Sequence, residues 1–99
     1  MVKLLMSWDI KPGREQSYFE FVVQEFVPGL MRLGLQPTEA WYTAYGVAPQ
    51  ILTGAVIGDR ETMHTLLAGD DWHDLRDRLQ EFVLNYRQKV VEAGGRFQL

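Results

Sequence analysis

Two histidines and one strand aspartate are the residues of this 99-residue chain that could move a proton. His64 lies between apolar residues in a short predicted helix, and imidazole is the side chain that changes charge near physiological pH. Asp9 ends the first predicted strand, and a carboxylate there could act as a proton acceptor. We therefore take His64 and Asp9 as the candidate catalytic residues. The alternative is that His64 is a surface or satisfied core residue and that Asp9 forms a salt bridge at the sheet edge.

Aromatic side chains are the second group with binding chemistry, since three tryptophans are many for a chain of this length. Tryptophan and tyrosine supply apolar walls with a polar tip, which is what a small-molecule pocket needs. The candidate ligand-binding residues are Trp8, Trp41, Tyr45, His64 and Arg96. The alternative is that the aromatic members of this set form the core and a subunit interface.

Arg96 and Asp9 have a second interpretation, because both fall on strands that we expect to be neighbours. They could form a substrate clamp, or an edge salt bridge worth at most about 1 kcal/mol. His73 has Asp70 and Asp77 at helical spacing, which could form a metal-binding face. A solvated acidic helix start explains the same residues, so we expect no metal site.

Composition excludes several classes of protein. The net charge is −3 and there is no lysine- or arginine-rich run, which argues against a nucleic-acid partner. The absence of cysteine excludes disulfides, thiolate metal sites and cysteine nucleophiles. No stretch approaches the roughly 20 apolar residues of a membrane span. The sequence has no GxGxxG, P-loop, GxSxG or HExxH motif, and we expect no cofactor. Because no membrane span is indicated, we expect a cytoplasmic location.

Hydrophobic periodicity predicts one domain over residues 1–99 with the order βαββαβ. Asp59 is the expected N-cap of the short helix, and Asp70 or Asp71 that of the last helix. Gly34 is expected to end the first helix in a left-handed conformation. The predicted elements are a strand at 2–9, a helix at 13–33, strands at 39–45 and 50–57, helices at 60–68 and 72–92, and a strand at 96–99.

This order predicts an α+β, ferredoxin-like fold: a four-stranded antiparallel sheet with the helices on one face. The segment 39–57 is a hairpin that is apolar on both faces, with Trp41 expected opposite Gly54. The uncovered face would carry either Leu5 with Ala40, Tyr42 and Ile51, or Trp8 with Trp41, Leu52 and Val56. Either set exposes more apolar surface than soluble monomers usually tolerate. We therefore expect a homodimer that packs sheet against sheet.

Three short motifs carry a resemblance to a known superfamily. They are Lys11-Pro12-Gly13 after the first strand, Gly34-Leu35-Gln36-Pro37 before the second, and Asp71-Trp72 at the start of the last helix. With them the chain resembles dimeric α/β-barrel domains, most closely the NIPSNAP-like, EthD-like and antibiotic-monooxygenase-like branches. The resemblance implies a dimer whose two sheets form a barrel, with a pocket in each subunit.

The resemblance also separates possible activities. Haem-degrading members have an asparagine on the first strand and a histidine about ten residues after a tryptophan. This chain has Ser7 and Asp9 on the strand and Phe82 ten residues after Trp72, so no haem is implied. Other members are oxygenases without a cofactor, or proteins with no known activity.

The sequence thus leads to three hypotheses. The first is a homodimer that binds a small apolar or aromatic molecule between sheet and helices. The second is a cofactor-independent monooxygenase, in which a substrate deprotonated by His64 or Asp9 itself reduces O₂. The third is a structural dimer with no small ligand.

Overall fold

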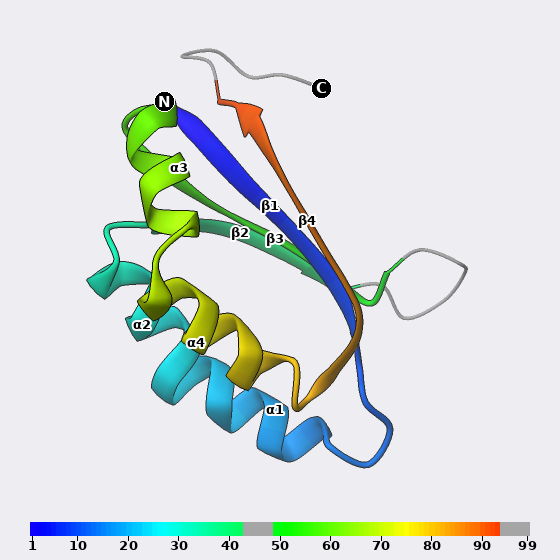
Figure 1. The fold of residues 1–99 in the computed structure, drawn as a ribbon. Helices are drawn as coiled ribbons and strands as arrows, with labels where there is room; N and C mark the ends of the chain where they lie inside the picture. Colours follow the sequence, from blue (N-terminus) through cyan, green and yellow to red (C-terminus); the bar gives the residue numbers. More distant parts are fainter. Residues whose placement is uncertain (43–48, 94–99) are drawn as a thin grey trace.

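The computed structural model describes residues 1–42 and 49–93, and it has the expected ferredoxin-like α+β fold. The sheet is antiparallel with strand order β2-β3-β1-β4, and Figure 1 shows the helices together on one of its faces. No helix in this part of the chain is long and apolar enough to cross a membrane. The elements are β1 (Val2–Ile10), α1 (Glu15–Phe21), η1 (Val22–Phe26), α2 (Val27–Arg32), β2 (Gln36–Tyr42), β3 (Ile51–Ile57), α3 (Arg60–Leu67), α4 (Asp70–Leu79) and β4 (Val83–Glu92).

Strand β1 is central in the sheet and supplies much of the core. Its alternate residues Val2, Leu4, Met6, Trp8 and Ile10 are buried beneath the helices, as a strand's period of two requires. The residues between them point to the other side of the sheet and are half-buried.

The first helical segment runs from Glu15 to Arg32 and contains one wide turn. Over η1 the backbone is a π-helix, and the Val27 N–H donates to the Val22 carbonyl, five residues back. Pro28 follows directly and has no N–H to donate to the preceding turn. Gly34 ends the segment at a φ of +94°, which confirms the expected left-handed residue.

The prediction of one long helix over 72–92 is wrong in its second half. Helix α4 ends at Leu79, and residues Val83–Glu92 form the strand that pairs with β1. A bulge places Asn85 and Tyr86 opposite the single residue Trp8, so the inward positions step from Val83 to Tyr86. Because inward residues three positions apart are also typical of one face of a helix, this step explains the helical periodicity of the segment. The strand expected at 96–99 lies outside the described part of the chain, as do all of residues 94–99.

Two smaller predictions about helix starts had different outcomes. Asp59 caps α3 as expected, since its carboxylate accepts the Thr62 N–H at 2.8 Å. Asp70 and Asp71 do not cap α4, because the N-cap is Gly69 and both aspartates lie in the first turn. There they still complement the positive end of the helix dipole.

The hairpin register differs from the expected one. Trp41 pairs with Leu52 rather than Gly54. The two sets expected on the uncovered face are therefore wrong, because Leu5 shares that face with Trp41 and Leu52, whereas Trp8 is buried under the helices. The open face is defined by the apolar residues Leu5, Trp41, Leu52, Val56, Leu84 and Val91.

Candidate functional site

A small apolar hollow lies between the helices and the β2–β3–β1 part of the sheet, and its volume is about 100 Å³. The sheet contributes Trp8 from β1, Ile51 and Thr53 from β3, and Pro37 and Ala40 from β2. Ala40 is exposed and β2 is an edge strand, so the hollow reaches the surface along this edge. Cavities of this order of size can take up a single aromatic ring.

The opposite wall comes from the helical segment with the wide turn. Its lining residues are Tyr18, Val22, Phe26, Val27 and Leu30, so both ends of η1 face the hollow. A π-helical turn inserts an extra residue into the helix, and such turns occur frequently at functional sites. Here the wide turn coincides with the hollow.

The polar group of the hollow is the contact between Trp8 and Tyr18. The Trp8 Nε1–H donates to the Tyr18 hydroxyl at 2.9 Å, and both residues are almost fully buried. Burial raises the pKa of Tyr18 above its ordinary value of 10, although the Trp8 hydrogen bond acts in the other direction. The Tyr18 hydroxyl is therefore protonated at neutral pH.

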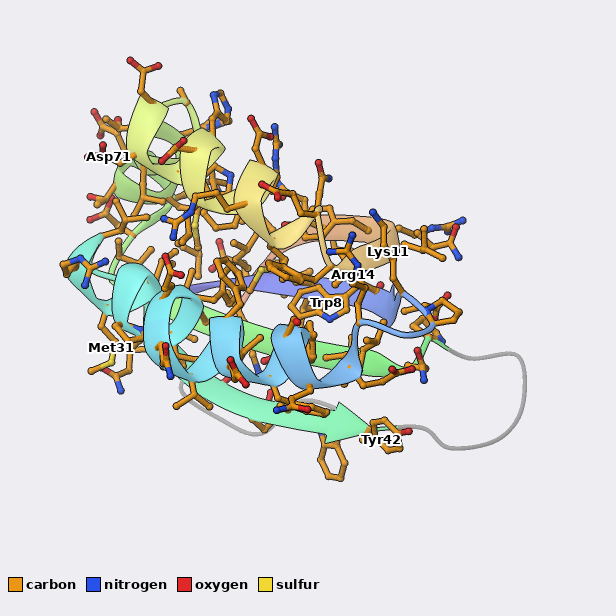
Figure 2. All side chains as sticks on the ribbon, turned by 90° about the horizontal axis from the view of Figure 1, so that it is seen from below. Trp8, Lys11, Arg14, Met31, Tyr42 and Asp71 are labelled. Atoms are coloured by element: carbon orange, nitrogen blue, oxygen red, sulfur yellow. The ribbon has the colours of Figure 1, made fainter. Side chains whose placement is uncertain are left out.

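Neighbouring rings hold Trp8 in place. Its indole stacks on Tyr86 with the ring centroids 6.0 Å apart, and it meets the Phe26 ring edge to face at the same distance. Figure 2 shows Trp8 behind helix α1. A side chain fixed from several sides presents a constant wall to a ligand.

Of the five expected ligand-binding residues, Trp8, Trp41 and His64 are described, and these three do not lie together. Trp8 lines the hollow, whereas Trp41 lies on the open face and is 64% exposed. Tyr45 and Arg96 fall outside the described residues. The expected meeting of Asp9 with Arg96 falls outside them as well.

His64 lies in a different hollow, between α3 and β4. This second hollow has a volume of about 320 Å³, and its other lining residues are Arg60, Met63, Leu67, Ala68 and Val90. Arg60 at its edge is paired with Glu92 at 2.7 Å. His64 therefore does not face Trp8, and a ligand in the first hollow would not contact it.

Asp9 connects β1 with β4 and with the residue before β3, and it lines neither hollow. Its carboxylate accepts the Gln50 backbone N–H at 3.0 Å and the Asn85 side-chain amide at 2.9 Å. The Asn85 hydrogen bond, followed by that of Gln50, lowers the pKa of Asp9 below its ordinary value of 3.8. A carboxylate with a lowered pKa is a weak base, so this position suits a structural role better than proton abstraction.

A larger hollow, of about 820 Å³, lies at the N-terminal ends of α3 and α4, and it carries Asp59, Glu61, Asp70 and Asp71. The helix starts already explain these carboxylates, through capping and the helix dipole. Within residues 1–42 and 49–93, no group of three or more potential ligands could hold a metal ion. We therefore place the candidate site in the smaller, aromatic hollow.

Sequence reasoning missed Tyr18 as a site residue. It falls at helical spacing in the broad apolar stripe of the predicted first helix, a position typical of a core residue. The signal that could have identified it is that a buried tyrosine hydroxyl needs a hydrogen-bond partner, which the Trp8 indole N–H supplies here. The remaining lining residues are apolar, and nothing in their types separates them from ordinary core residues.

No protein-family model and no curated protein matches the chain. Solved structures do match over nearly its whole length. A NIPSNAP family protein from Agrobacterium tumefaciens aligns with a TM-score of 0.71 at 15% identity, over 95% of this chain and 93% of its own. The chain has the fold of these proteins. An EthD family protein from Bacillus halodurans gives a TM-score of 0.72 at 13% identity, over 95% and 100% of the two chains.

A third similar structure carries an enzyme name. It is a candidate antibiotic biosynthesis monooxygenase from Deinococcus radiodurans, with a TM-score of 0.67 at 17% identity over 100% and 98% of the chains. Together the three confirm the resemblance drawn from the Lys-Pro-Gly, Gly-x-x-Pro and Asp-Trp motifs, at the level of fold. At these identities, a shared fold does not carry an activity with it.

Proposed function

We propose that this protein is a homodimer that binds a small apolar or aromatic molecule in the hollow between its sheet and helices. The observation that carries the proposal is the hollow itself, with aromatic walls and one buried polar contact between Trp8 and Tyr18. Apolar walls with a few placed polar groups are the usual composition of a small-molecule site. The widened helical turn at η1 supports the same position.

Filling the hollow tests the proposal. Ala40 lies at its exposed edge on β2, so Ala40→Phe should place a ring in the space that a ligand would occupy. We expect the unmodified protein to bind ethylbenzene or acetophenone by calorimetric titration, and Ala40→Phe to weaken both at least tenfold. Phenylalanine is compatible with a strand position, so the variant should fold.

Ala68→Phe is the matched control, because it fills the second hollow, beside His64. If Ala68→Phe weakens binding and Ala40→Phe does not, the ligand site is the His64 hollow and the position proposed here is wrong. If neither probe binds the unmodified protein, the hypothesis of a structural dimer without a ligand gains support.

A cofactor-independent monooxygenase is the second candidate, and the name of the Deinococcus radiodurans protein with the same fold favours it. The described lining of the hollow contains no imidazole or carboxylate to deprotonate a substrate. Oxygen uptake with a dihydroxyanthracene, lost in His64→Ala, would support this activity. Uptake at the rate of a protein-free control would argue against it.

A further inference from the structure

The Tyr18 hydroxyl donates no hydrogen bond to any of the described residues. The oxygen of this hydroxyl accepts the Trp8 indole N–H, which uses one of its lone pairs. Its own O–H remains available, since the contact with Trp8 is the hydrogen bond that this hydroxyl makes with residues 1–42 and 49–93. A buried donor without an acceptor is costly, so this proton marks a place where an acceptor would be stabilising.

The direction of this hydrogen bond defines the chemistry of a ligand. The indole N–H can only donate, so the hydroxyl must be the acceptor in the Trp8–Tyr18 contact. The hydroxyl is then left as a donor toward anything beside it. Its raised pKa keeps it protonated, and the rings of Phe26 and Tyr86 hold Trp8, which in turn holds the hydroxyl.

The remaining described lining of the hollow is apolar apart from Thr53. The Thr53 hydroxyl already donates its proton to the Glu39 carbonyl at 2.8 Å. The hollow therefore offers one free donor proton among apolar walls, and no carboxylate or imidazole that would favour a cation or a donor-rich molecule.

We propose that Tyr18 determines specificity in this hollow, and that the ligand is a compact apolar molecule with one hydrogen-bond-accepting oxygen, such as a ketone, an ester or an ether. The inference rests on the proposed ligand-binding function and adds the chemical class of the ligand. An acceptor oxygen would accept a hydrogen bond from the Tyr18 hydroxyl, while the rest of the molecule packs against Val22, Phe26 and Ile51.

Two probes of similar size and shape test the inference. Acetophenone has a carbonyl oxygen, and ethylbenzene has none. We expect the unmodified protein to bind acetophenone about two- to tenfold more tightly in calorimetric titrations, the value of one hydrogen bond. Tyr18→Phe keeps the ring and should abolish this preference by weakening acetophenone alone.

Tyr86→Phe is the matched control. It also removes a hydroxyl from a ring in contact with Trp8, but Tyr86 donates to Gln88 at 2.7 Å and does not line the hollow. This variant should keep the preference for acetophenone. Thermal unfolding of both variants shows that each is folded.

The outcomes separate the two proposals. If both probes bind equally and Tyr18→Phe changes neither, the role of Tyr18 is overturned while ligand binding stands. If Tyr86→Phe abolishes the preference as Tyr18→Phe does, the preference does not come from the Tyr18 proton. If neither probe binds the unmodified protein, both proposals fail together.

Discussion

Asp9 has a side chain that could act in catalysis, but its hydrogen bonds give it a structural role. It stands where β1, the start of β3 and the bulge of β4 come together, and its two oxygens accept one hydrogen bond from Gln50 and one from Asn85. These hydrogen bonds favour the ionised form, which is why its pKa is lowered. Stability should therefore depend on the charge of this residue.

The sign of that dependence follows from the direction of the shift. A carboxyl with a lower pKa in the folded state stabilises the fold above its unfolded pKa, near 3.8, and the contribution is lost as the pH falls toward the folded value. We expect Asp9→Asn to lower the free energy of unfolding by about 1 kcal/mol at pH 7. The difference from the unmodified protein should shrink as the pH falls below about 4, as urea unfolding at several pH values would show.

The exposed Asp74 on α4 provides the control for this experiment. Asp74→Asn should leave the free energy of unfolding nearly unchanged across the same pH range. A constant difference between Asp9→Asn and the unmodified protein down to pH 3 would contradict the role assigned to the Asp9 charge.

At the scale of elements, the end of α4 and the start of β4 decide how the sheet is completed. Asn85 has a φ of +58°, a conformation that a helix does not contain and that asparagine tolerates better than most residues. Its amide also reaches Asp9. The bulge at Asn85 is thus fixed both by backbone conformation and by a side-chain hydrogen bond.

Substitutions at Asn85 distinguish this strand from the helix that periodicity alone indicates. Both Asn85→Gly and Asn85→Ala lose the hydrogen bond to Asp9, but only glycine adopts a positive φ without strain. We expect Asn85→Gly to be more stable than Asn85→Ala by about 1 kcal/mol in chemical unfolding. A helix would give the opposite order by about the same amount, because alanine is the better helix former.

At the scale of the whole molecule, the open face is the feature that a single chain leaves unexplained. Figure 1 shows the helices on one side of the sheet, and Trp41 and Leu52 lie side by side on the other, 64% and 44% exposed. Neighbouring exposed apolar residues of this size usually mark an interaction surface. A second copy of the chain would cover them by an interface of two-fold symmetry.

The dimer can be tested by placing a charge on this face. We expect light scattering to give twice the chain mass of 11.4 kDa for the unmodified protein, and 11.4 kDa for Leu52→Asp. A buried unpaired carboxylate would be too costly for the interface to persist. Met31, exposed on α2 in the helical layer (Figure 2), is the control, and Met31→Asp should keep the dimer. A mass of 11.4 kDa for the unmodified protein at micromolar concentration would contradict the proposal.

The sequence by itself determined the fold class and most of its elements. Alternation in β1, the glycine after the first helix and the Asp59 cap are local signals, because each depends on residues within a few positions of one another. The Lys-Pro-Gly and Gly-x-x-Pro motifs are local as well. They led to the ferredoxin-like fold that the similar structures share.

Only the tertiary structure decided that Val83–Glu92 form a strand and where the candidate site lies. Val83 and Tyr86 have helical spacing because a bulge, which exists only through pairing with β1, adds a residue to the strand. Trp8 and Tyr18 come together across the core, and Trp41 turns to the opposite face through the register with β3. Pairing and packing between distant segments are not encoded in the local pattern, so residue types alone grouped Trp8 with Trp41 and left Tyr18 out.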